Sequence, residues 1–200
     1  MTPFEPDLPV HAFRDEGAFE RWLSRNHDRS KGIWIRVAKR DSGIASVTHA
    51  EALEVALCYG WIDGQRRALD ATHFLQRFTP RRPKSMWSQI NREKAARLVG
   101  TGRMQPPGLR EIERARADGR WDAAYAGQRS ATVPEELQRL LDRNKKARAF
   151  FETLDSRNRY AFIWRVQEAK KPETRVRRAE QFVAMLAKGE VLHPPGSRTR

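Results

Sequence analysis

The spacing of hydrophobic residues changes along the chain, and the change predicts two kinds of structure. In KGIWIRVAKR, Ile33, Ile35 and Val37 occupy alternate positions, which is typical of a half-buried strand. From about Ser85 onward, apolar residues recur at intervals of three and four, which indicates helices. The pattern therefore predicts strands mixed with helices before residue 83 and helices alone after it.

Turn residues divide the first part into short elements. Asp63-Gly64 is typical of a turn, and Pro80 with Pro83 is expected to end a strand. The DSG triplet at 41–43 predicts a hairpin that would pair the first strand with the residues after it. Further strands are expected at residues 44–47, 67–69 and 72–78.

Capping residues predict where the helices begin. Thr48 and Glu51 form a capping box, in which each side chain can bond the backbone N–H of the other residue. A helix is expected to start near Ser85, so that Trp87 and Asn91 share one face. Further caps are expected at Asp15, at Thr132 with Glu135, at Asn144 and at Ser156.

These elements predict an α+β fold with a short antiparallel sheet in a small N-terminal domain, followed by an all-helical C-terminal half. The expected organisation is an extended tail at 1–12, an α+β domain with its trailing helices at 13–118, a linker at 119–132, a helical domain at 133–190 and a flexible tail at 191–200.

Charge adds a preference for acidic partners. The chain has 39 Lys and Arg against 25 Asp and Glu, a formal net charge of +14. Residues 1–60 carry 8 basic and 9 acidic side chains, whereas residues 61–120 carry 14 and 6. A positive field of this size favours anionic ligands, acidic partners or nucleic acid. Arg accounts for most of the excess, and its abundance has a purely compositional reading as well.

Most enzyme signatures are absent from the sequence. There is no Walker loop, Rossmann glycine run or nucleophile elbow, and the five His show no metal-ligand spacing, so we expect no metal and no cofactor. The single cysteine, Cys58, lies among apolar neighbours and is interpreted as buried. An acid/base cluster of Asp63 and Asp70 with His73, centred on Asp63 and His73, is the enzymatic alternative.

The N-terminal residues lack the basic start and apolar core of a signal peptide. No apolar run approaches the ~20 residues of a membrane helix. We therefore expect a cytoplasmic protein without a membrane span.

The stretch FTPRRPKSMWSQIN, residues 78–91, is the main candidate for a binding site. Its prolines stiffen the backbone around several cations, and rigid guanidinium groups suit carboxylates and phosphates. The expected pocket lies between this stretch and the WIDG sequence, with two tryptophans as walls. Its candidate residues are Trp61, Asp63, Arg77, Arg81, Arg82, Lys84, Ser85, Trp87 and Asn91. The alternative is that the cations are solvated and Trp87 belongs to the core.

A second basic feature lies near the C-terminus. Arg175, Arg177 and Arg178 cluster on a predicted helix, which could bind nucleic acid or form a solvated outer face. Nucleic-acid binding is therefore the second functional hypothesis.

Four segments, taken together, resemble the YdeI/OmpD-associated, or bacteriocin-protection, family across roughly residues 50–190. They are EALEVALCYGWIDGQ, FLQRFTPRRPKSMWSQIN, GRMQPPGLREIERARADGRWDAAY and RNRYAFIWRVQEAKKPETRVRRAEQFVAMLAKGE. The resemblance implies a bacterial protein linked to stress or antimicrobial-peptide tolerance, with an N-terminal half similar to YdhG-like α+β domains. It supplies no catalytic residues. The expected function is non-enzymatic binding of an anionic ligand or acidic partner.

Overall fold

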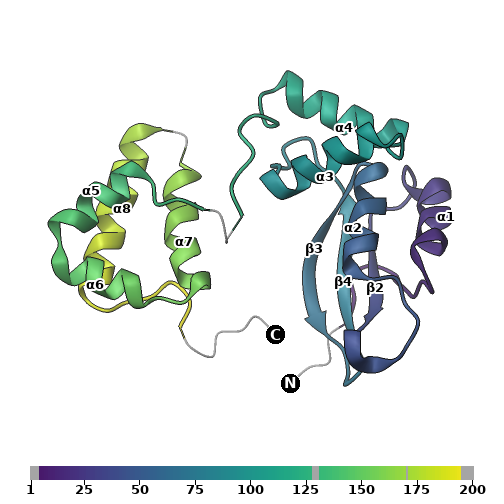
Figure 1. Ribbon diagram of the computed structural model, residues 1–200, viewed down its shortest axis with the longest axis horizontal. Coiled ribbons are helices and arrows are strands. Elements are labelled where there is room, and N and C mark those ends of the chain that lie inside the picture. Colours follow the sequence, from purple (N-terminus) through teal and green to yellow (C-terminus); the bar gives the residue numbers. More distant parts are fainter. Residues whose placement is uncertain (1–4, 128–130, 170, 195–200) are drawn as a thin grey trace. The chain divides into compact units, whose positions relative to one another are not determined.

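The computed structural model describes residues 5–127, 131–169 and 171–194 (Figure 1). These residues form two compact units, one extending to Tyr125 and the other beginning at Ala126. The predicted linker at 119–132 includes the boundary between the units. Within the first unit, Trp121 is only 8% exposed and belongs to the core.

A four-stranded mixed sheet forms the centre of unit 1. The strands are β1 (Val10–His11), β2 (Ile33–Ala38), β3 (Trp61–Ala68) and β4 (His73–Pro80), in the order β1-β2-β4-β3. β1 runs parallel to β2, and the other pairs are antiparallel. The prediction of a purely antiparallel sheet was therefore wrong, as was the assignment of residues 10–11 to a tail.

The predicted hairpin partner of β2 at residues 44–47 does not form. Residues Arg40–Ser42 make a 3₁₀ turn, η1, and β4 pairs with all six residues of β2. This longer partner sets Phe74 and Phe78 opposite Val37 and Ile33 on the core face. A four-residue segment offers a shorter ladder and fewer cross-strand pairs.

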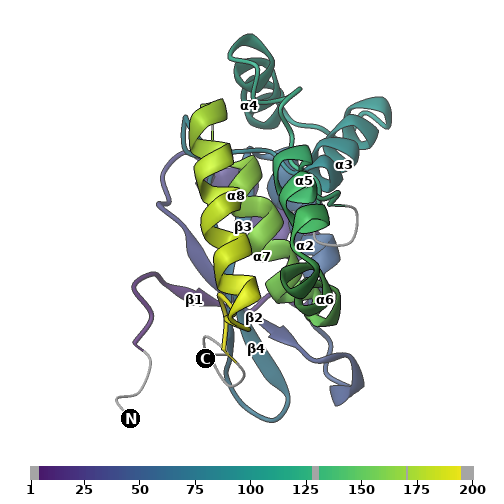
Figure 2. The same ribbon diagram turned by 90° about the vertical axis from the view of Figure 1, so that its left-hand side faces the viewer.

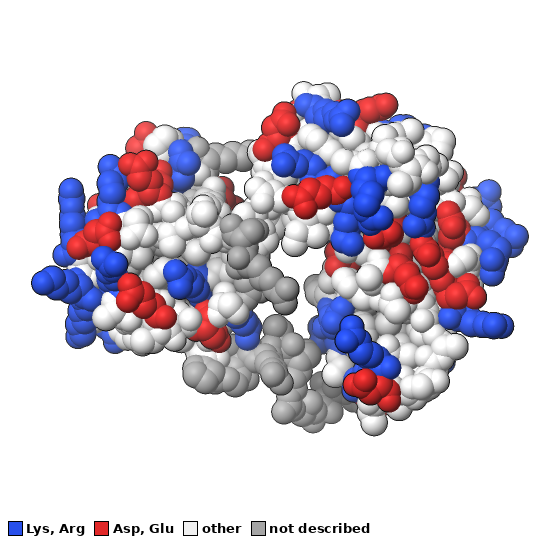
Figure 3. Space-filling view, viewed as in Figure 1, with Lys and Arg blue, Asp and Glu red and all other residues white. Residues whose placement is uncertain are grey.

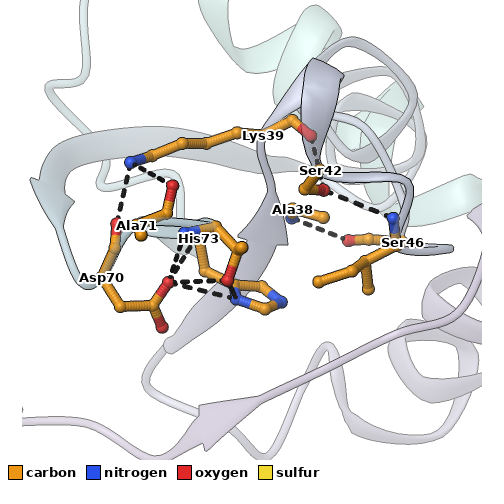
Figure 4. Close-up of polar contacts among 9 residues, drawn as sticks. Ala38, Lys39, Ser42, Ser46, Asp70, Ala71 and His73 are labelled. Atoms are coloured by element: carbon orange, nitrogen blue, oxygen red, sulfur yellow. Dashed lines mark hydrogen bonds and ion pairs between the residues drawn. The ribbon is translucent and has the colours of Figure 1, made fainter.

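The turn expected at Asp63-Gly64 does not form, because both residues lie inside β3. A bulge between Asp63 and Arg66 gives β3 one residue more than the facing part of β4. The hairpin turn comes at residues 69–72 (Figure 4). There the Asp70 carboxylate accepts hydrogen bonds from the backbone N–H of Thr72 and His73, each at 2.7 Å. Bonds from the backbone and side chain of Thr72 lower the pKa of Asp70 to about 2. Lys39 Nζ donates to the Asp70 carbonyl at 2.8 Å and ties the turn to the end of β2.

Two helices cover one face of the sheet: α1 (Glu16–Asn26) and α2 (His49–Cys58) (Figure 1). Both begin where their caps predict. Asp15 accepts from the Ala18 backbone at 2.8 Å, and Thr48 and Glu51 form the reciprocal capping box. Their apolar faces meet the inward-facing residues of the sheet in one core, which also takes in α3 (Gln89–Gly100) and α4 (Pro106–Ala117).

Residues 81–88, the β4–α3 connection, are irregular, and the prediction of a helix from Ser85 was wrong. Ser88 forms an isolated bridge with Tyr125, and the Trp87 carbonyl accepts from the Tyr125 backbone at 3.0 Å. That extended pairing is incompatible with helical geometry, so α3 begins only after Ser88, which caps it by accepting from the Asn91 backbone at 3.2 Å. Trp87 therefore precedes the helix and does not share a helical face with Asn91.

The described residues of unit 2 form the four helices α5 to α8, as their apolar periodicity predicts (Figure 2). They are α5 (Glu135–Arg143), α6 (Lys145–Thr153), α7 (Ser156–Gln167) and α8 (Pro172–Ala187). α8 packs against the other three around a core that includes Leu137, Phe162 and Leu186.

The caps of unit 2 agree with the sequence only in part. Asn144 caps α6 by accepting from the Ala147 backbone at 3.0 Å. Asp155, one residue before the expected Ser156, caps α7. The capping box predicted at Thr132 and Glu135 does not form, because α5 begins at Glu135 with Pro134 at the N-cap position. Glu135 is therefore the first residue of the helix and not the third, which a capping box requires. Across the described ranges, no helix is long and apolar enough to span a membrane.

Candidate functional site

The two tryptophans expected to form pocket walls belong to different aromatic clusters. Trp61 stacks edge-on against Trp22, with ring centroids 5.9 Å apart, and its Nε1 donates to the His27 carbonyl at 3.1 Å. Trp87 packs against Trp121 with centroids 4.9 Å apart. The structure therefore does not bring Trp61 and Trp87 together as the walls of one pocket.

Asp63 and Arg77 point to opposite faces of the sheet. Asp63 is paired with Phe78 and shares its core face, whereas Arg77, one residue earlier on β4, faces the other way. Arg77 forms an ion pair with Asp7 at 2.8 Å. These two candidates cannot contact one ligand from the same side of the sheet.

The acid/base pair predicted between Asp63 and His73 does not form. Asp63 contacts His49 Nε2 at 3.0 Å, while His73 contacts Asp70 in the hairpin turn. Five strand positions separate His73 from Phe78, the residue opposite Asp63, so the two groups are too far apart to share a proton. The His49–Asp63 contact could not be foreseen, because His49 reads as an exposed first-turn residue.

The remaining candidates in the β4–α3 connection are mostly in solvent. Arg82 and Lys84 are exposed, and Asn91 is half-buried. Ser85 Oγ accepts from the Arg82 backbone at 3.0 Å and closes a local turn. These residues surround the one buried cation of the stretch, Arg81.

The predicted nucleic-acid residues lie on α8. Arg175 contacts Glu136 at 3.5 Å and Arg178 contacts Glu168 at 3.8 Å, while Arg177 is exposed. On the face shown in Figure 3, basic and acidic side chains are interspersed. Nucleic-acid binding thus stays a prediction, and the contacts of these α8 arginines do not favour it over a solvated outer face.

Three polar residues are buried among those that the structure describes: Gln76, Arg81 and Asn158. Gln76 donates to the Gly64 carbonyl at 2.9 Å and accepts from Arg66 at 3.1 Å. Asn158 exchanges two hydrogen bonds with the backbone of His193, at 3.0 and 2.9 Å. The first and third are thus satisfied, as buried polar groups usually are.

Arg81 is different, because two of its three side-chain nitrogens have no hydrogen-bond partner. The residue is 6% exposed, and its guanidinium lies over the Trp87 ring, 3.6 Å from the centroid. Nη1 donates to the Met86 carbonyl at 3.2 Å. Nε and Nη2 are buried and have no hydrogen-bond partner.

The unused atoms of Arg81 form one chemical unit. Nε–H and one Nη2–H point the same way along an edge of the planar guanidinium, and this edge matches the two oxygens of a carboxylate or phosphate. Burial lowers the pKa of Arg81 to about 10, so the group keeps its positive charge at neutral pH. The site therefore presents a charged, bidentate donor inside the protein.

Long-range contacts hold Arg81 and its surroundings in place. Its backbone N–H donates to the Gly60 carbonyl at 2.9 Å, at the junction of α2 and β3. Arg120 Nη1 donates to the Ser85 carbonyl at 2.7 Å, and Arg92 Nη1 donates to the Trp121 carbonyl at 3.2 Å. Residues far apart in sequence therefore fix the β4–α3 connection.

Two further buried atoms near Arg81 lack partners: Trp87 Nε1, a donor, and Glu111 Oε2, an acceptor. Glu111 lies on α4, which sequence reasoning left out of the site. Its Cγ would be 3.0 Å from a Cβ placed on Gly60, the residue that accepts from the Arg81 backbone. No sequence motif marks this approach, which depends on the packing of α4 against α2.

Other chemistry has less support in the described residues. No group of three or more His, Cys, Asp and Glu side chains is placed to hold a metal ion in the part of the chain that the structure describes. Cys58 is buried, as predicted, and desolvation raises the pKa of its thiol to about 11. A thiol of this kind is a poor nucleophile at neutral pH.

The fold and site thus define an α+β unit with a buried, unsatisfied arginine, followed by a four-helix unit. Residues 11–111, just over half of the chain, match the domain of unknown function DUF8412, and residues 130–189 match the family described as "Bacteriocin-protection, YdeI or OmpD-Associated". The chain belongs to the DUF8412 family through its first unit, and the second match confirms the resemblance to the bacteriocin-protection family.

The two matches fall on different units of the structure. The segments before residue 126 that were expected to share the YdeI/OmpD-associated resemblance lie outside the second match. Arg81 and Glu111 both lie within the first. Searches of curated proteins and of solved structures gave no match.

Proposed function

We propose that this protein binds a small anionic ligand and that Arg81 is the residue that anchors the anion. The observation that supports this proposal is the buried Nε/Nη2 edge of Arg81, which has no partner. The match to the bacteriocin-protection family supports a protein of that general type. Binding of an anion at Arg81 is the molecular function that we propose for it. A cytoplasmic location is part of the proposal.

The cost of burying Arg81 favours a binding role over a purely structural one. A charge that is taken out of water without an ion pair destabilises the folded state. Gln76 and Asn158, in comparably buried positions, are fully engaged with the backbone or a neighbouring side chain. An anion on the free edge of Arg81 would supply two charge-assisted hydrogen bonds and offset the cost of desolvation.

Thermal unfolding in the presence of inorganic phosphate, sulfate and short carboxylates tests this proposal. A ligand that binds only the folded protein raises the midpoint temperature, and the rise grows with the ratio of ligand concentration to Kd. Two variants each remove one positive charge from neighbouring positions, Arg81→Met at the buried edge and Arg82→Met in solvent.

The proposal predicts that at least one of these anions stabilises the parent and Arg82→Met equally, while Arg81→Met gains nothing. Equal stabilisation of all three proteins would assign the effect to general screening by salt and contradict a site at Arg81. An absence of stabilisation by every anion in the parent would contradict it as well.

The match over residues 130–189 favours a second, cellular test. We propose that the protein increases bacterial tolerance of bacteriocins, as the description of the matching family suggests. Survival of a sensitive strain should rise when it expresses the parent, and the rise should be lost with Arg81→Met if ligand binding is needed. Equal survival with and without expression of the parent would contradict a protective role.

A further inference from the structure

Glu111 gives the site around Arg81 a second charge of opposite sign. Its side chain is 14% exposed, and Oε1 accepts from Arg114 Nη1 at 2.8 Å. Oε2 is buried and has no hydrogen-bond partner. A carboxylate oxygen in that position requires a donor from elsewhere, because an unpaired buried acceptor is costly.

Arg81 and Glu111 both approach Gly60. The Gly60 carbonyl accepts from the Arg81 backbone, and the Cγ of Glu111 would be 3.0 Å from a Cβ at Gly60. Glu111 is also the acidic group that acts most strongly on the charge of Arg81. Yet the two side chains form no ion pair, and each keeps unpartnered atoms. A group that bridged the two charges would give partners to the unpartnered atoms of both.

The unpartnered atoms define what such a bridging group must carry. Arg81 offers two N–H donors and Trp87 offers a third through Nε1, so this side of the site calls for an acceptor with a negative charge. Glu111 Oε2 offers an acceptor, so the other side calls for an N–H donor, preferably a cationic one. A simple anion would satisfy Arg81 and leave Glu111 Oε2 without a partner, and the Glu111 carboxylate would also repel a doubly charged phosphate.

We propose that the ligand is a small zwitterion, a molecule with a carboxylate for Arg81 and an ammonium group for Glu111, such as a free amino acid. This inference rests on the proposed anion site and specifies the class of its ligand. With such a molecule bound, Arg81 faces a carboxylate and the free oxygen of Glu111 faces an ammonium group. Such pairing is the condition under which buried charges are tolerated.

Isothermal titration calorimetry with matched probes tests the inference on the full-length protein. The probes are a series of free amino acids, the corresponding acids without the amino group, such as propionate for alanine, and inorganic phosphate. The variants are Glu111→Gln and Arg81→Lys, with Glu113→Gln as the control because Glu113 is an exposed acid on the same helix. Circular dichroism establishes that each variant is folded.

We expect at least one amino acid to bind the parent about tenfold or more tightly than its deaminated counterpart, because a buried acceptor left unpaired penalises the analogue. Glu111→Gln should remove this preference and leave the affinity for the carboxylate unchanged, whereas Glu113→Gln should bind as the parent does. Arg81→Lys keeps the charge but loses the bidentate edge, and it should bind both probes more weakly.

The outcomes separate the two levels of the proposal. If carboxylates or phosphate bind through Arg81 as tightly as amino acids, and Glu111→Gln changes nothing, the zwitterion inference is overturned and the anion site stands. If no probe binds the parent, or if Arg81→Lys binds every probe as the parent does, the proposed anion site fails and the inference fails with it.

Discussion

The two units differ in how they treat a buried polar residue. In unit 2, Asn158 is 7% exposed and exchanges two hydrogen bonds with the His193 backbone. In unit 1, Arg81 is 6% exposed and leaves two N–H groups without a partner. The two side chains are therefore about equally buried, but Asn158 is fully hydrogen-bonded and Arg81 is not.

This difference teaches how to distinguish a structural polar group from a binding group. Asn158 connects α7 to the segment after α8 and completes the fold of its unit. Arg81 makes one side-chain hydrogen bond, to a carbonyl five residues away. Its guanidinium also contacts the Trp87 ring, but Nε and Nη2 stay without partners. The first residue is expected to matter for stability, and the second for binding.

The largest effect is expected from Gly108→Ala, which tests whether close packing of α4 on α2 builds the neighbourhood of the site. A Cβ at this position would lie 2.4 Å from both the Cys58 carbonyl oxygen and Met104 Sδ. Overpacking against a backbone carbonyl should lower the free energy of unfolding of unit 1 by about 3 kcal/mol. Native-state hydrogen exchange, which reads the amides of each unit separately, measures the change.

Gly100→Ala is the matched control in the neighbouring helix α3. Nothing lies within 4 Å of a Cβ at Gly100, and its backbone is not in the left-handed region. This change should leave unit 1 unaffected or stabilise it by about 0.5 kcal/mol. Equal losses from both substitutions would show that the Cys58–Gly108 approach has no special role.

Asn158→Ala should have an intermediate effect, confined to unit 2. The substitution leaves the backbone N–H and carbonyl of His193 without their partners, and it should cost about 2 kcal/mol. Hydrogen exchange of the core amides of α5, α7 and α8 measures the loss. Gln181→Ala, at an exposed position on α8, serves as the control and should change little. A loss no greater than that of Gln181→Ala would contradict a structural role for Asn158.

The smallest effect on stability, and one of opposite sign, is expected from Arg81→Met. Methionine fills a similar volume against Trp87 without a buried charge, so the free energy of unfolding should stay constant or rise by about 1 kcal/mol. Chemical denaturation of the parent and the variant without ligand provides the comparison. A loss of several kcal/mol would instead place Arg81 with Asn158, as a residue that the fold requires.

Local patterns predicted local structure well. The alternation around Ile35 marked β2, the Thr48 box marked the start of α2, and Asn144 marked the start of α6. For the two caps the determining contacts lie within three residues, whereas β2 owes its strand to β1 and β4 as well as to its own alternation. The turn predicted at Asp63-Gly64 and the helix start predicted at Ser85 were wrong, because pairing with distant residues overrode the local signals. The partner is β4 in the first case and Tyr125 in the second.

The sequence predicted where the candidate site lies but not which residues form it. The sequence located the basic stretch 78–91 and included Arg81 among several equivalent cations. Only the fold distinguishes Arg81 from Arg82. The burial of Arg81 depends on its contacts with Gly60 and Trp87 and on the residues packed around them. Glu111 had no signal of its own, because an acid in an amphipathic helix reads as a solvated residue.

The most direct test of the central claim is nitrogen–proton correlation NMR of the arginine Nε–H groups during titration with propionate, phosphate and alanine. The Arg81 signal is assigned by its absence from the spectrum of Arg81→Met. The account predicts that this signal shifts to saturation with at least one of these ligands while that of exposed Arg82 does not move. An Arg81 signal that stays unmoved by all three ligands would contradict an anion site at Arg81.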